Sequence, residues 1–217
     1  MLSIHISKAL LTNMSHLLDD TPPATHSLQQ WYAHQVMISG EPCVILMEAK
    51  SRYALVMCGM TDEEFGLFPE IFRERLWQNV MAICPVEMDD DIALLSNLVL
   101  DAADEQAYLP GFDRSVMGHI TQVVDHLRYM VEEEGYPLPS NDRDAILFGL
   151  HVNEDLRKTR LHKDYFVPIR EFSKFWMEKL HSTDTEPLPQ LPPMTAGKKV
   201  PDNVIHVNFL TGKRQPL

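Results

Sequence analysis

The sequence predicts an α+β fold, in which four to five helices pack on a small antiparallel sheet containing a central hairpin, followed by a proline-rich C-terminal tail. Two periodicities and one composition figure support this. Apolar residues alternate within residues 2–6 and form short strand-like runs up to residue 58, then recur every three or four residues. Apolar residues make up 45% of the 217 residues and charged residues 23%, as in folded globular chains. We expect one domain over 1–182 and a tail over 183–217.

The first part of the chain is expected to supply the strands. Alternation over 2–6 predicts a half-buried strand, and Ser7 is placed to cap a brief helix after it. Further strands are expected at 35–38, 43–47 and 53–58. The last two form a hairpin.

A four-residue loop over 49–52 sets the register of this hairpin. Glu48 then pairs with Tyr53, and counting outward places Cys43 opposite Cys58. Two interpretations stay open: small apolar side chains in a sheet core, or a redox-active pair.

Helices follow from residue 61. Thr61 and Glu64 have the spacing of a capping box, which predicts a helix that runs until Pro85. Three aspartates at 89–91 fall on the first turn of the next helix, where its dipole stabilises them without a metal. Residues 105–112 are expected to be short and extended.

The strongest helical pattern runs from Arg114 to Gly135. A polar row lies beside its apolar stripe and consists of His119, Gln122, His126 and Tyr129. This row is either a solvent-exposed face or a surface for a protein partner or a second copy. His119 and His126 are two turns apart, about 10 Å, too far to share a metal ion.

Two more helices and a terminal strand complete the expected elements. Ser140 is placed to cap a helix over 144–148, and Pro168 to begin the last helix of the domain. Beyond the prolines, alternation over 204–210 predicts a strand with Ile205, Val207 and Phe209 as its apolar residues. It docks either on its own sheet or on that of a partner.

Charge and motifs exclude several classes of function. The net charge of −12 disfavours direct nucleic-acid and membrane binding, and no apolar stretch is long enough to span a bilayer. Without a signal-peptide pattern or paired cysteine motifs, the expected location is the cytoplasm. Phosphate-binding loops, zincin motifs and hydrolase motifs are absent from the sequence, so no cofactor or metal is expected and catalysis is disfavoured.

Three motifs carry a resemblance to a family. Trp31-Tyr32-Ala33, Arg52-Tyr53 after the hairpin loop, and Arg114-Ser115-Val116-Met117-Gly118 at a helix start occur in this order. Over about residues 1–180 the chain resembles an uncharacterised bacterial domain-of-unknown-function family in which these motifs occur together. His119 and Ile120 depart from the small polar residue and methionine expected there. The resemblance implies no activity.

The same residues suggest an anion site. Two arginines, Arg52 and Arg114, and Ser115 at a helix start are residue types that bind phosphate or carboxylate. Trp31 would line this site, and His119 would assist the chemistry there if the protein is an enzyme. In the alternative interpretation, Arg114 pairs with Asp113 or Asp104, Ser115 caps the helix and Trp31 packs in the core.

Two functional hypotheses follow. The first is a non-enzymatic cytoplasmic interaction or regulatory protein, of the kind encoded in bacterial accessory or defence loci. The second is an enzyme acting on a phosphate-containing substrate through Arg52 and Arg114.

Overall fold

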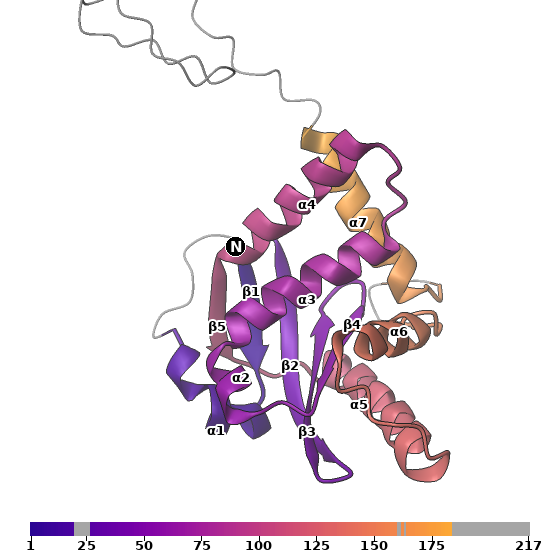
Figure 1. The fold of residues 1–217 in the computed structure, drawn as a ribbon. Coiled ribbons are helices and arrows are strands. Elements are labelled where there is room, and N and C mark those ends of the chain that lie inside the picture. Colours follow the sequence, from indigo (N-terminus) through magenta and orange to yellow (C-terminus); the bar gives the residue numbers. More distant parts are fainter. Residues whose placement is uncertain (20–26, 160–161, 163, 184–217) are drawn as a thin grey trace, which may run out of the picture. The chain divides into compact units, whose positions relative to one another are not determined.

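The computed structural model describes residues 1–19, 27–159, 162 and 164–183 (Figure 1). Met1–Thr183 form one compact unit. The strands are β1 (Leu2–Ile6), β2 (Gln29–Ile38), β3 (Glu41–Glu48), β4 (Ala54–Cys58) and β5 (Gln106–Pro110). The α-helices are α1 (Lys8–Met14), α2 (Asp62–Gly66), α3 (Phe68–Ile83), α4 (Asp89–Asp104), α5 (Arg114–Arg128), α6 (Asp142–Val152) and α7 (Pro168–Thr183).

The sheet is mixed, with strand order β4-β3-β2-β1-β5. β1 runs parallel to both of its neighbours, whereas β2, β3 and β4 are antiparallel. The α+β class is confirmed, but the prediction of a small antiparallel sheet with four to five helices is wrong: the described residues form five strands and seven α-helices. Alternation identifies a strand without revealing its partner or direction, so the parallel half of the sheet was missed.

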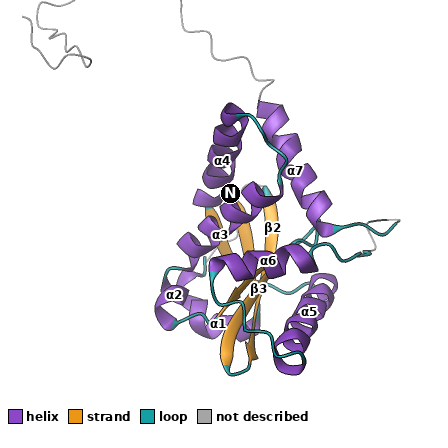
Figure 2. Cartoon of the chain, turned by 45° about the vertical axis from the view of Figure 1, so that its right-hand side comes forward, coloured by secondary structure: helices purple, strands orange, loops and turns teal. Residues whose placement is uncertain are grey.

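Helices cover both faces of the sheet (Figures 1 and 2). One apolar cluster joins β1 to α1, α3, α4 and α7, and includes Trp31, Phe72 and Phe172. A second cluster joins β3 and β4 to α5 and α6, and includes Ile45, Val56 and Ile120. Burial on both faces explains why residues 43–47 are apolar without interruption.

Local signals account for most helix starts, with some corrections. The capping box is confirmed, since Thr61 Oγ1 accepts from the Glu64 amide at 3.3 Å and the Glu64 carboxylate accepts from the Thr61 amide at 2.7 Å. A single helix is predicted from this point, but the helix breaks at Leu67 and α3 begins at Phe68. Pro69 lies in the first turn of α3, a position that suits proline because the amide groups there have no partner within the helix. Asn141, and not Ser140, caps α6.

The side chain of Asn153 forms hydrogen bonds to the outer edge of β4 at Ala54, the first residue of the strand. Asn153, just after α6, accepts a hydrogen bond from the Ala54 amide at 2.7 Å and donates one to the Ala54 carbonyl at 2.8 Å. Its exposed fraction is 1%. This pair of bonds ties the end of α6 to the sheet.

Candidate functional site

The β3–β4 hairpin places Arg52, and its predicted register is confirmed. The Glu48 amide donates to the Tyr53 carbonyl at 2.9 Å, and Cys43 lies opposite Cys58. The Glu48 carboxylate folds the loop by accepting from the Ser51 amide at 2.6 Å. Arg52 ends the loop with a φ of 59°, a left-handed conformation that is uncommon outside glycine.

The Arg52 guanidinium joins this loop to α5. Nη1 donates to the Ala49 carbonyl, and Nη2 donates to Ser115 Oγ at 3.1 Å. Burial lowers the pKa of Arg52, while Asp113 and Glu48 act in the opposite direction. The structure therefore brings together two of the residues that the sequence suggested for an anion site.

The segment between β5 and α5 passes over the strands on the α5 side of the sheet. Gly111 lies against His5, so closely that a methyl group there would be 2.5 Å from the His5 ring. His5 stacks on Tyr32 with ring centroids 4.7 Å apart. Asp113 caps α5 by accepting from the Val116 amide at 2.8 Å, and its charge adds to the effect of burial in raising the pKa of Tyr32.

His119 lies one turn after Ser115 and connects to a second arginine. Its Nδ1 is 3.4 Å from Gln122 Oε1, which also accepts a hydrogen bond from Arg157 Nη1. Burial lowers the pKa of His119, and the positive charges of Arg52 and Arg157 lower it further. Both guanidinium groups are therefore near this imidazole.

Arg157 is a site residue that sequence reasoning missed. It lies in the segment after α6, where its backbone pairs with Phe166 through two hydrogen bonds of 2.8 and 2.9 Å. Its side chain is 6% exposed, and Nη2 donates to the Val152 carbonyl at 3.4 Å. Residues 153–158 carry no periodicity or motif, so no sequence signal distinguishes this arginine from a surface residue.

Buried arginines in this protein fall into two kinds. Arg75, 8% exposed, is paired with the Asp142 carboxylate at 2.5 Å. Arg52, 5% exposed, and Arg157 have no carboxylate within 4.0 Å in the described part of the chain. Their described hydrogen bonds go to neutral oxygens.

Other candidate residues lie elsewhere. Trp31 and Tyr53 are fully buried in the cluster on the opposite face of the sheet, where Tyr53 donates to Asn79 Oδ1 at 3.0 Å. Arg114 is exposed and, among the described residues, has no ion pair with Asp113 or Asp104 within 4.0 Å; Asp104 pairs with Arg73 at 2.6 Å.

The polar row on α5 is divided between packing and solvent. The His126 ring lies 5.8 Å from Phe148 and 5.2 Å from His151, against α6. Tyr129 is 56% exposed in the π-helical turn after α5. Ile205, Val207 and Phe209 fall outside the described residues.

Within the described ranges, no group of three or more His, Cys, Asp or Glu side chains is placed to hold a metal ion. In the same ranges, no helix combines the length and apolar character needed to cross a bilayer.

Comparison with known proteins gives a family without an activity. A search of curated proteins found no match. The model of one family, described as "Domain of unknown function (DUF6933)", matches residues 3–171. This match spans β1 through the first turn of α7 and so contains Arg52, Ser115, His119 and Arg157. The chain therefore belongs to the DUF6933 family.

Proposed function

We propose that this protein is a non-enzymatic regulatory protein of the bacterial cytoplasm that binds a phosphate-bearing ligand between Arg52 and Arg157. One observation carries the proposal: both arginines are buried, and the described residues give neither of them an ion-pair partner. Asp113 and Glu48 favour the charge of Arg52 and Asp155 that of Arg157, but none of these carboxylates lies within 4.0 Å of its arginine. Burying a charge without an ion pair is unfavourable, and a bound anion would compensate both charges directly.

Groups around the two arginines suit an oxyanion. Ser115 supplies a hydroxyl, and α5 supplies the positive end of a fifteen-residue helix. Ser115 and Gln122, which hold the two guanidinium groups, are seven residues apart, about 10 Å along the helix. His119 lies between them. The proposal keeps Arg52, Ser115 and His119 from the sequence-based site and replaces Arg114 with Arg157.

Binding is better supported than catalysis. Ser115 Oγ accepts from Arg52, and His119 Nδ1 contacts Gln122; among the described residues no hydrogen bond joins the Ser115 hydroxyl to the His119 imidazole. A serine nucleophile activated by histidine needs that bond. A protein partner or a second copy of the chain would then recognise the ligand-bound form of the protein.

The experiment is calorimetric titration of the full chain with inorganic phosphate and with sulfate, using chloride at equal ionic strength as the reference. We expect phosphate to bind the wild type, and at least tenfold weaker binding in Arg52→Gly and in Arg157→Gln. Glycine suits the left-handed backbone at residue 52, so this variant removes the guanidinium without backbone strain.

Arg114→Gln is the matched control, because Arg114 is an exposed arginine beside the same helix start. It should bind phosphate like the wild type. Equal heats for phosphate and chloride, or equal losses in the Arg114 and Arg157 variants, would contradict the proposed site. Steady hydrolysis of p-nitrophenyl phosphate that disappears in Ser115→Ala would instead favour the enzyme.

A further inference from the structure

Cys43 and Cys58 face each other directly across the β3–β4 ladder. The Gly59 amide donates to the Pro42 carbonyl at 2.9 Å, which makes the next pair outward a hydrogen-bonded one. Hydrogen-bonded and non-hydrogen-bonded pairs alternate in an antiparallel ladder, so Cys43 and Cys58 form a non-hydrogen-bonded pair. Such pairs have Cα atoms about 4.5 Å apart, inside the range of about 4.4–6.8 Å that a disulfide spans.

The two side chains also lie on the same face of the sheet. Both belong to the cluster under α5 and α6, and directly opposite residues of an antiparallel pair have Cβ atoms about 4.5–5.5 Å apart. A sulfur–sulfur bond therefore needs no movement of either strand.

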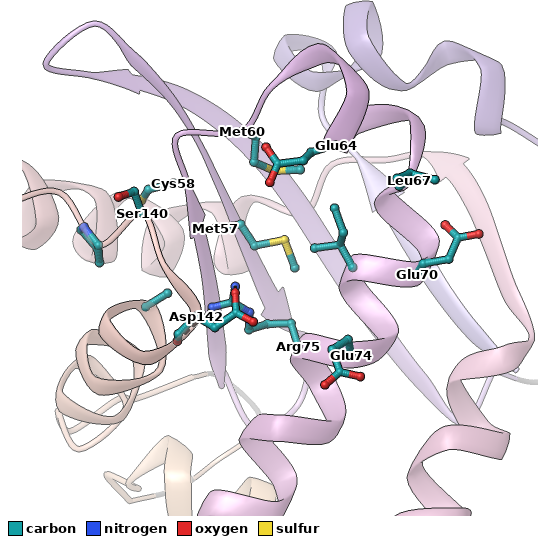
Figure 3. Close-up of a pocket in the computed structure, with 13 residues that line it drawn as sticks. Met57, Cys58, Met60, Glu64, Leu67, Glu70, Glu74, Arg75, Ser140 and Asp142 are labelled. Atoms are coloured by element: carbon teal, nitrogen blue, oxygen red, sulfur yellow. Dashed lines mark hydrogen bonds and ion pairs between the residues drawn. The ribbon is translucent and has the colours of Figure 1, made fainter.

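An oxidant has a route to one of the two sulfurs. Cys58 lines a pocket of about 320 Å³ between the end of β4, helix α3 and the segment before α6. Figure 3 shows Cys58 beside Ser140 at the margin of this pocket, with Arg75 and Asp142 farther along it. Cys43, with an exposed fraction of 0%, lies behind Cys58.

Cys84 provides an internal comparison. It is as buried as Cys58, at 7% exposed, but it belongs to the region under α7, where its sulfur lies 3.9 Å from the Ser173 carbonyl. No second cysteine faces it, since the other two cysteines of the chain pair across β3 and β4.

We propose that Cys43 and Cys58 are an oxidative modification site, at which a hydroperoxide converts the facing thiols into a cross-strand disulfide. One of the two facing sulfurs attacks a peroxide oxygen, the O–O bond breaks, and the thiol proton leaves with the departing oxygen as water, or as an alcohol from an organic hydroperoxide. The other sulfur then attacks the resulting sulfenic acid, the S–O bond breaks, and its proton leaves with that oxygen as water. The two thiols lose two electrons in total, and the peroxide gains them.

The test is oxidation of the folded full chain with hydrogen peroxide, followed by denaturation, thiol alkylation and mass spectrometry. We expect the intact mass to fall by about 2 Da before alkylation, as two hydrogen atoms leave. The number of alkylated cysteines should fall from three to one, with Cys84 as the labelled residue. Peptide mapping should find Cys43 linked to Cys58, and dithiothreitol should restore three labelled thiols.

Two variants serve as controls. Cys84→Ala should still lose the two hydrogens and leave no labelled thiol, whereas Cys58→Ala should keep both remaining thiols. Three labelled thiols after oxidation of the wild type, a sulfinic acid on Cys58, or a disulfide that contains Cys84 or joins two chains would each overturn the proposal.

Discussion

Arg52 Nη2 donates to Ser115 Oγ at 3.1 Å, and this bond connects the loop between β3 and β4 to the first turn of α5. The donor is charged and almost fully buried, while the acceptor lies on the exposed side of the helix start. A neutral hydroxyl satisfies one N–H group of the guanidinium, while the described carboxylates that act on its charge, Asp113 and Glu48, do so from beyond 4.0 Å. The bond therefore positions the arginine without neutralising it.

The energetic weight of this bond is measurable by a double-mutant cycle. Ser115→Ala should lower the free energy of unfolding by about 1 kcal/mol in the wild type, because it removes a hydrogen bond to a charged group that water partly replaces. In the Arg52→Gly background, the same change should have little or no effect. Urea denaturation of the four proteins gives the coupling, and equal effects in both backgrounds would mean that the bond contributes nothing.

Gly111 should tolerate no side chain. A Cβ there would lie 2.5 Å from His5 Nδ1 and 2.6 Å from His5 Cβ, so Gly111→Ala must displace β1 or the segment before α5. We expect a loss of about 1–3 kcal/mol in the free energy of unfolding, as in overpacked cores.

Gly118→Ala is the control for that substitution. Gly118 lies within α5, and beyond its own helical turns no atom of the described residues lies within 4 Å of the position that a Cβ would take. Alanine should therefore stabilise the protein by about 0.5–1 kcal/mol through helix propensity. The idea of a close approach at Gly111 fails if both alanine variants melt at or above the wild-type temperature.

Anion binding should strengthen as the pH falls. Burial and the two arginines lower the pKa of His119 below its ordinary 6.5, so the imidazole is neutral near pH 7. A bound anion favours the imidazolium and raises that pKa, and by linkage the affinity rises as the pH drops below about 6.5.

Sulfate is the suitable probe for this dependence, because its charge stays constant over the range. Calorimetric titration should show tighter sulfate binding at about pH 5.5 than at about pH 7.5 in the wild type, and a flat profile in His119→Gln. An identical slope in the two proteins would assign the pH dependence to another group.

Local signals in the sequence predicted most of the individual elements. The Thr61 capping box, the start of α5 near Arg114 and the hairpin register each depend on residues within a few positions of one another. Cys43 opposite Cys58 followed from counting out from a four-residue loop, since an antiparallel register is fixed by its turn.

Long-range relationships were not predictable in this way. The pairing of β1 with β5 joins Leu2 to Gln106, and periodicity within either strand does not encode that partner. Arg157 was missed for the same reason. Its burial depends on contacts with Gln122 of α5 and with Phe166, neither of which is adjacent to it in the sequence. Trp31 and Arg52 belong to consecutive motifs in the sequence. Trp31 packs in the cluster with α3 and α7, whereas Arg52 bonds to α5 on the opposite face of the sheet.

The side chain of Asn153 limits strand pairing between two molecules of this protein at the edge of β4. Ala54 belongs to a non-hydrogen-bonded pair of the hairpin, so its amide and carbonyl point outward from the edge of β4, where a foreign strand would attach. The Asn153 amide offers the same donor and acceptor as a neighbouring strand and occupies both positions. One buried asparagine thereby blocks the first rung for edge-to-edge aggregation at this end of the sheet.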